Sequence, residues 1–104
     1  MWAQLITARL HQGTDHGLAD LFNQLQATEE PGTGLIRSLA MQDPKNPGQV
    51  YLLAVFESEE KARAREQDPE RQQALRPAKT MMADMFGGPP EFLDLDVIAE
   101  IAGQ

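Results

Sequence analysis

Cysteine is absent from the sequence, and its absence removes several kinds of chemistry at once. Without thiols the chain forms no disulfide, no thiolate metal site and no cysteine nucleophile. This composition fits a reducing compartment, and we expect a cytoplasmic protein. Long apolar runs are also missing, since no stretch reaches the roughly 18 consecutive apolar residues of a membrane span. The N-terminus lacks the basic segment and cleavage site of a secretory signal, so we expect neither secretion nor a membrane partner.

Positive charge is scarce as well. Nine Lys and Arg oppose 16 Asp and Glu, which gives a formal net charge of −7. Proteins bind phosphate backbones through clustered cations, and the sequence has no basic stripe, so we expect no nucleic-acid partner. The remaining composition, 41% hydrophobic and 24% charged, is that of an ordinary globular chain. A length of 104 residues predicts one domain over residues 1–104.

Apolar periodicity predicts the order strand, helix, strand, strand, helix, strand. Thr14 or Asp15 is expected to cap the first helix, and Ser58 is expected to cap the second helical segment. The second helical segment should break at Asp68-Pro69, a new N-cap followed by proline, and bend or divide at Pro77. The expected strands span residues 2–10, 35–42, 49–56 and 91–101, the expected helices span 17–28 and 58–86, and a hairpin loop is expected over 43–48.

This order is the split βαβ plan of an α+β, ferredoxin-like sandwich, with a four-stranded antiparallel sheet and both helices on one face. The strand expected over 49–56 is apolar on both sides. A sheet with one wet face would instead alternate apolar and polar residues. We therefore expect the face without helices to be covered by a second copy of the chain in a homodimer.

Short motifs at the element boundaries resemble those of the antibiotic biosynthesis monooxygenase-like family of dimeric α+β barrels. The likeness runs over nearly the whole chain, and its specific parts are Gly13-Thr14, Pro31-Gly32, residues 55–60, residues 68–70 and residues 88–90. These are turn and cap residues, so they identify an architecture better than a reaction.

The resemblance implies a cofactor-independent monooxygenase, without metal or other cofactor, acting on a small quinol or a polyphenolic, polyketide-like aromatic ligand. In such enzymes the carbanion or phenolate of the substrate itself reduces oxygen. A non-enzymatic ligand-binding or assembly domain of the same fold remains the alternative. Haem degradation is disfavoured, because the haem-degrading branch uses an asparagine, a tryptophan and an axial histidine where this chain has Ile6 or Thr7, Arg65 and about Ala74.

Few residues are candidates for catalysis. His11 and His16 are the only histidines, and no third metal ligand of a suitable type is near them, although Asp15 is adjacent. They are either solvated loop residues or, for His11, a general base. Asp94 and Asp96 share one face of the last strand. They form an acid and base pair, or structural ion pairs at the dimer interface with Arg9 or Arg37 as cationic partners, or they protrude into water at the end of the strand.

The substrate is expected in a cavity between sheet and helices. Methionines at helical spacing, including Met82, either line this adaptable apolar pocket or belong to the ordinary core. Polar side chains on the strands would orient the ligand. The expected substrate-binding residues are Gln4, Thr7, Arg37, Tyr51 and Met82.

Overall fold

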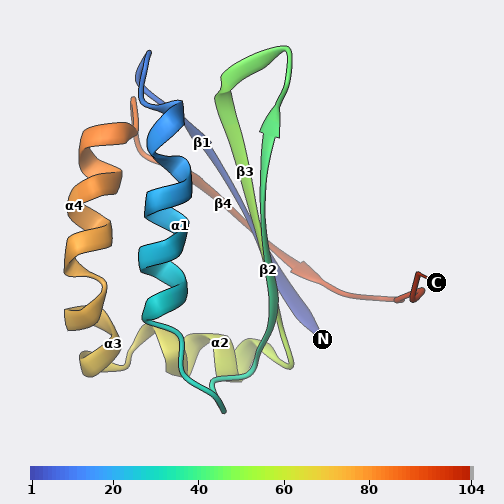
Figure 1. Ribbon diagram of the computed structural model, residues 1–104. Helices are drawn as coiled ribbons and strands as arrows, with labels where there is room; N and C mark the ends of the chain where they lie inside the picture. Colours follow the sequence, from blue (N-terminus) through green and yellow to red (C-terminus); the bar gives the residue numbers. More distant parts are fainter. Residues whose placement is uncertain (104) are drawn as a thin grey trace.

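A computed structural model describes residues 1–103, apart from the side chain of Asp15. The described part contains four strands and four α-helices (Figure 1). None of these helices is long and apolar enough to span a membrane. The strands are β1 (Trp2–Arg9), β2 (Leu35–Asp43), β3 (Asn46–Phe56) and β4 (Glu91–Asp96); the helices are the 3₁₀ turn η1 (Asp15–Gly17), α1 (Leu18–Ala27), α2 (Glu59–Glu66), α3 (Pro69–Ala74) and α4 (Arg76–Met85).

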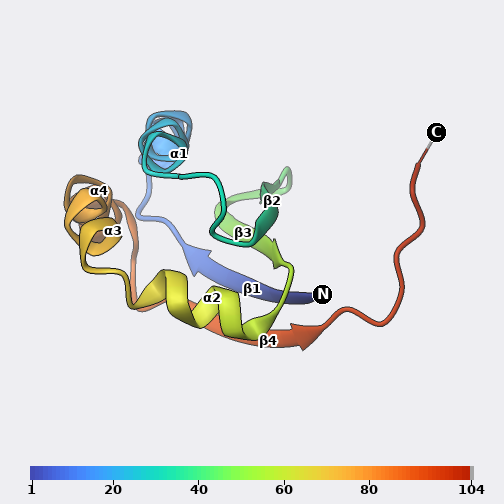
Figure 2. The same ribbon diagram turned by 90° about the horizontal axis from the view of Figure 1, so that it is seen from below.

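The strands form one sheet in the order β2-β3-β1-β4, and every neighbouring pair is antiparallel. Helices α1 and α4 stand side by side over one face of the sheet, and α2 crosses its lower end (Figures 1 and 2). In the described part of the chain, no helix lies on the opposite face. The predicted α+β ferredoxin-like fold is therefore confirmed.

The predicted breaks in the second helical segment are confirmed with their capping residues. The Ser58 hydroxyl accepts a hydrogen bond from the Lys61 amide at 3.2 Å and begins α2. The Asp68 carboxylate accepts from the Glu70 amide at 3.0 Å, and α3 follows with proline at its start. Pro77 lies in the first turn of α4, so it divides the segment, because it can begin a helix but cannot continue one.

Two boundary predictions were wrong, one for Thr14 at the start of α1 and one for the hairpin between β2 and β3. Thr14 does not cap α1; its hydroxyl donates to the carbonyl oxygens of His11 and Met85, and Gly17 stands at the N-cap position without a side-chain cap. The side chain of Asp15, the other expected cap, lies outside the described residues. The hairpin loop is also shorter than expected. β3 begins at Asn46, directly opposite Asp43, and a register shift beside this pair absorbs the extra residues.

The last strand is shorter than the predicted range 91–101. Asp96 pairs with Trp2, which is the first residue of β1. The amide of Val97 donates to the carbonyl oxygen of Met1 at 3.1 Å, and the contact between β4 and β1 ends with this hydrogen bond. Residues 97–103 leave the sheet as an extended tail (Figure 2).

Two apolar clusters pack between the sheet and the helices. The larger one joins Ala8 and Val50 of the sheet to Leu21 of α1 and to Ala78 and Met85 of α4. The smaller one lies under α2. It consists of Trp2, Phe56 and Ala62, with Leu35 and Ala54 beside them. The helical stripes predicted from the sequence therefore face the sheet.

The opposite face of the sheet is apolar and open. Strand register places Leu53 of β3 between Leu5 of β1 and Leu39 of β2, all on this face. Side chains from the edge strands β2 and β4 are the most exposed, with Leu39 at 47% and Leu93 at 54%. The prediction that the central strand is apolar on both sides is confirmed. We name this surface the open face; it includes Leu5, Leu39, Met41, Leu53, Val55, Leu93 and Leu95.

Candidate functional site

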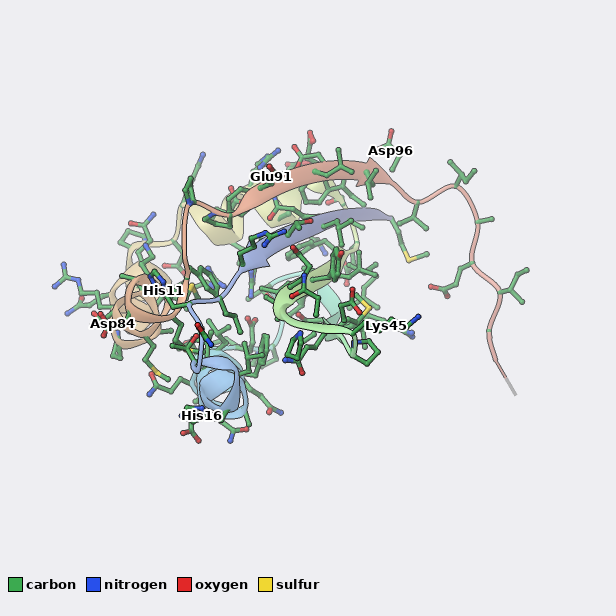
Figure 3. The ribbon with its side chains drawn as sticks, turned by 90° about the horizontal axis from the view of Figure 1, so that it is seen from above. His11, His16, Lys45, Asp84, Glu91 and Asp96 are labelled. Atoms are coloured by element: carbon green, nitrogen blue, oxygen red, sulfur yellow. The ribbon has the colours of Figure 1, made fainter. Side chains whose placement is uncertain are left out.

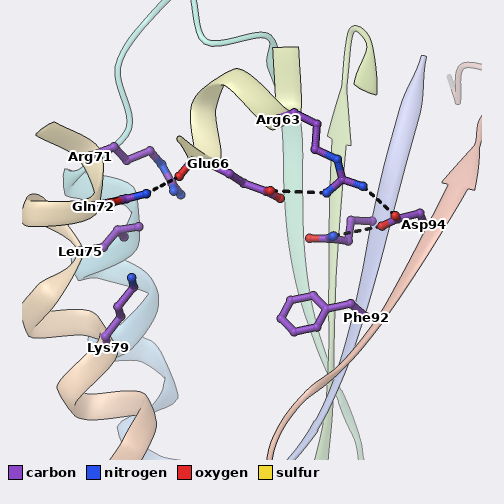
Figure 4. Close-up of a pocket in the computed structure, with 9 residues that line it drawn as sticks. Arg63, Glu66, Arg71, Gln72, Leu75, Lys79, Phe92 and Asp94 are labelled. Atoms are coloured by element: carbon purple, nitrogen blue, oxygen red, sulfur yellow. Dashed lines mark hydrogen bonds and ion pairs between the residues drawn. The ribbon is translucent and has the colours of Figure 1, made fainter. Parts of the chain in front are cut away.

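A cavity of about 570 Å³ lies between the helix-covered face of the sheet and helices α2 to α4 (Figure 4). It is large enough for a small aromatic ligand, since ligand pockets usually span roughly 300–1,000 Å³. Strands β1 and β4 form one wall, and α3 with α4 forms the other wall. Helix α2 forms the end of the cavity that is uppermost in Figure 4, and we call it the upper end; in Figure 1 the same helix lies at the lower end of the sheet. Its lining residues are Gln4, Arg63, Glu66, Arg71, Gln72, Leu75, Lys79, Phe92 and Asp94.

Arg63 of α2 organises the upper end of the cavity. Its guanidinium donates to Asp94 of β4 at 2.8 Å and to Glu66 at 3.4 Å. It also lies 5.1 Å from the ring centroid of Trp2, within the range of a cation–π contact. On the other side of Asp94, the Gln4 amide donates to the second carboxylate oxygen at 3.1 Å. These contacts tie α2 to both strands of the cavity wall.

The same contacts favour the charged forms of Asp94 and Arg63. Hydrogen bonds from Gln4 and then from Arg63 hold the pKa of the Asp94 carboxyl below its ordinary value. In return, the hydrogen bond to Asp94 raises the pKa of Arg63. Asp94 is thus an ionised carboxylate with each oxygen engaged by a donor. This arrangement suits a structural acceptor better than a general base, which needs a free lone pair and a pKa nearer neutrality.

The opposite wall is cationic. Arg71, Leu75 and Lys79 follow one another at four-residue spacing along α3 and α4, and all three line the cavity (Figure 4). Arg71 and Arg65 both pair with the carboxylate of Glu29, and the distance between Arg71 and Glu29 is 3.8 Å. Burial, together with the charge of Arg65, lowers the pKa of Arg71.

Phe92 provides an exposed aromatic surface inside the cavity. It projects from β4 toward the helices, and 60% of its surface remains accessible (Figure 4). A large aromatic side chain this exposed beside a cavity is uncommon in a folded chain and suits stacking against a planar ligand. Leu75 lies on the facing helical wall and is buried. The cavity therefore has one apolar side chain on each wall, Phe92 on the strand side and Leu75 between the two cations on the helix side, below the hydrogen-bonded upper end.

The structure divides the residues predicted to bind substrate between two faces of the sheet. Gln4 lines the cavity, and Met82 packs in the larger core cluster. Thr7, Tyr51 and Arg37 project from the open face instead, because strand register places them with Leu5, Leu53 and Leu39. These five residues are therefore not brought together within one chain.

The two aspartates differ from each other in their surroundings. Both project from the helix-covered side of β4, as expected from their spacing. The expected cationic partners, Arg9 and Arg37, were wrong, because both lie in the register of the open face. Arg63 is the partner of Asp94. Asp96 is exposed at the end of β4, away from the cavity lining (Figure 3).

The histidines lie away from this cavity. His11 is exposed in the turn after β1, and its imidazole lies near Gly87. His16 is also exposed and points from the far side of the start of α1 (Figure 3). Among the described side chains, no group of three or more His, Asp or Glu is placed to hold a metal ion. Neither histidine is therefore positioned as a base for a ligand in the cavity.

One signal in the sequence could have predicted the cationic wall. Arg71, Leu75 and Lys79 recur every four residues, which places them on one side of a helix. Arg63 and Phe92 offered no such signal, because α2 and β4 come together only through the sheet topology.

A four-stranded antiparallel sheet with its helices on one face defines the class of ferredoxin-like α+β domains, and the comparisons narrow this class to one family. The model of the antibiotic biosynthesis monooxygenase family matches residues 1–77, and the chain belongs to this family. No curated protein matches the sequence.

Solved structures with the same fold cover nearly the whole chain. The cofactor-independent oxygenase SnoaB from Streptomyces nogalater superposes with a TM-score of 0.77 at 13% identity, covering 98% of this chain and 97% of its own. A protein of unknown function from Nitrosomonas europaea gives a TM-score of 0.74 at 16% identity, covering 99% of this chain and 94% of its own. At such identities the likeness extends to the fold alone.

Proposed function

We propose that the chain is a cofactor-independent monooxygenase that oxidises a small phenolic or quinol-type aromatic compound in the cavity beneath the helices. The observation that supports this proposal is the pairing of an exposed aromatic surface, Phe92, with the cations Arg71 and Lys79 in one cavity. Membership of the antibiotic biosynthesis monooxygenase family supports a monooxygenase reaction. The Streptomyces neighbour is itself described as a cofactor-independent oxygenase.

The chemistry needs no electron donor besides the substrate. With 1-naphthol as the simplest case, the ring loses its hydroxyl proton and the hydrogen of the para carbon. One oxygen atom of O2 becomes the new carbonyl of 1,4-naphthoquinone, and the other leaves as water. The naphthol supplies all four electrons that the two oxygen atoms accept, so atoms and electrons balance.

The cavity residues would assist by charge and position. Cations beside a phenol favour its ionised form, because an opposite charge within a few ångströms lowers the pKa of the hydroxyl. Arg71 and Lys79 would hold the phenolate, and Phe92 would fix the plane of the ring. The hydroxyl proton would pass to solvent through the open mouth of the cavity. Electron density in the phenolate ring would then attack oxygen.

One observation favours a non-enzymatic ligand-binding protein as the second candidate. Among the described residues that line the cavity there is no histidine, and the carboxylates of Glu66 and Asp94 both pair with Arg63. None of these lining residues is therefore available as a general base for a phenol. The oxygen-uptake experiment below separates the two candidates.

We also propose that the working form is a homodimer joined through the open face. Leu39, Leu93 and Leu95 would be covered there, together with the half-buried leucines of the central strands. An uncovered apolar sheet of this kind is unfavourable in water, and an identical sheet is a self-complementary cover.

Oxygen uptake with a panel of naphthols and hydroquinones tests the proposed reaction. We expect uptake above the rate in buffer, with one quinone formed for each oxygen molecule consumed in the naphthol reactions. The substitution Phe92→Ala should lower kcat/KM by about tenfold, because an aromatic contact to the substrate ring is lost. Ile98→Ala, at an exposed position of the tail, serves as the matched control and should leave the rate unchanged.

The absence of turnover across the panel, with protein of verified native fold, would contradict the enzymatic proposal. Saturable binding of the same compounds without turnover would support the ligand-binding alternative.

A further inference from the structure

The side chains that line the cavity carry more positive than negative charge. Three cations, Arg63, Arg71 and Lys79, line the cavity against two carboxylates, Glu66 and Asp94. This local excess occurs in a chain whose overall net charge is −7. Because the surrounding protein repels anions on average, the excess marks a place where a negative group is selectively tolerated.

The distribution of ion pairs locates the excess on one wall. Arg63 uses both carboxylates of the cavity, Asp94 at 2.8 Å and Glu66 at 3.4 Å. Lys79 has no carboxylate within 4.0 Å among the described side chains. Arg71 must share Glu29 with Arg65. The unbalanced charge therefore lies on the α3 and α4 wall, on either side of Leu75.

The cations Arg71 and Lys79 lie on the helix side of the cavity and are not part of the hydrogen-bonded group at the upper end. Arg71 and Lys79 are two helical turns apart, with Leu75 between them, and Phe92 projects from the facing strand (Figure 4). A planar ring lying between Leu75 and Phe92 has cations along one edge. A carboxylate on that edge would accept charge-assisted hydrogen bonds, which are stronger than those of a neutral hydroxyl.

We infer that Arg71 and Lys79 form a subsite for a carboxylate substituent, so that the preferred ligand is an aromatic hydroxy acid rather than a neutral phenol. This inference rests on the proposed function for the aromatic ring and its cavity, and it adds the permanent negative group. Lys79 contributes most to the preference, since its ammonium group is not engaged elsewhere in the described structure.

Calorimetric titration with a matched pair of probes tests the inference without requiring turnover. The probes are 1-hydroxy-2-naphthoate and 1-naphthol, which share a ring and differ in the carboxylate, and the titrations are run without oxygen. The carboxylate should bind at least about tenfold more tightly, as expected for a charge-assisted contact. The preference should weaken at high salt, because the cations lie at an open mouth.

Variants on α4 assign the preference to the subsite. Lys79→Gln should lower the affinity for the carboxylate by about tenfold and that for 1-naphthol by a smaller factor, because only the carboxylate is an anion in free solution. Arg76→Gln removes the same charge from the same helix outside the cavity and should change neither affinity. Both positions are exposed, so the variants are expected to fold.

Three outcomes would overturn the inference: equal affinity for the two probes, a carboxylate preference that Lys79→Gln does not reduce, or the absence of saturable carboxylate binding. Carboxylate binding that depends on Lys79, combined with no oxygen uptake from any phenol, would instead remove the monooxygenase proposal and leave the subsite standing.

Discussion

Glu29 shows how much can depend on one side chain in this protein. It follows α1, and its carboxylate pairs with Arg65 of α2 and Arg71 of α3. The Arg65 side chain is only 11% exposed, and its guanidinium lies 5.4 Å from the ring centroid of Phe56. In the described part of the chain, the Nε atoms of both arginines are buried without a hydrogen-bond partner. Glu29 is therefore the main compensation for two partly desolvated cations.

Replacing Glu29→Gln should destabilise the protein. Two neighbouring guanidinium groups would keep their burial and lose their carboxylate, which costs about 2 kcal/mol for a pair that is not fully buried. Chemical denaturation of wild type and variant measures the difference. Glu30→Gln is the matched control, because Glu30 is the next residue, is exposed and takes part in no ion pair among the described side chains. Equal losses for the two variants would contradict the prediction.

Among the secondary-structure elements, the contact between the start of β2 and α2 sets the position of the upper cavity wall. Gly34 precedes β2 with φ of +87°, and its carbonyl oxygen accepts from the Glu57 amide at 2.8 Å. A Cβ atom at this glycine would lie 2.7 Å from Cβ of Lys61, which is fixed to the helix backbone. Glycine therefore permits both the left-handed conformation and the close approach of α2.

A comparison of two glycines separates these effects. Gly32 has the same φ of +87°, but a Cβ atom added there would have no neighbouring atom within 4 Å. Gly32→Ala should cost about 1 kcal/mol of unfolding free energy from backbone strain alone. Gly34→Ala should cost about 3 kcal/mol, because the steric clash with Lys61 is added. Thermal or urea denaturation measures both, and similar losses would show that α2 moves aside without cost.

For the whole molecule, the open face is an apolar surface that the single chain leaves uncovered. Its edge-strand leucines are 39% to 54% exposed, while those of the central strands are half-buried. The helices occupy only the other side of the sheet in the described structure (Figures 1 and 2). A partner sheet is the proposed cover, whereas the cavity is lined from the helix-covered side of the sheet.

Sedimentation over a range of concentrations tests the proposed dimer. The wild-type chain should sediment as a dimer, and Leu93→Glu should weaken association by at least about 100-fold, because each partner would bury an unpaired carboxylate. Leu93 is 54% exposed in the single chain, so the variant should keep its fold. Ala83→Glu adds the same charge to an exposed position of α4 and should remain dimeric. A wild-type monomer at high concentration would contradict the proposal.

Local features of the sequence determined most of the architecture. The caps at Ser58 and Asp68 and the proline at Pro77 act within one or two turns, so their effects were predictable. The predicted end of β4 failed for a different reason: a strand continues only while a neighbour offers backbone groups, and β1 begins opposite Asp96. That limit depends on a partner nearly the full length of the chain away.

The candidate site was decided by tertiary structure. Residue spacing alone placed Asp94 and Asp96 on one side of a strand, and it identified the apolar character of both sheet faces. It did not determine which face the helices cover, and this choice separates Gln4 in the cavity from Thr7 on the open face. Charges from α2, α3 and β4 meet only after the sheet has formed, so the cavity and its cationic wall come from packing between distant segments.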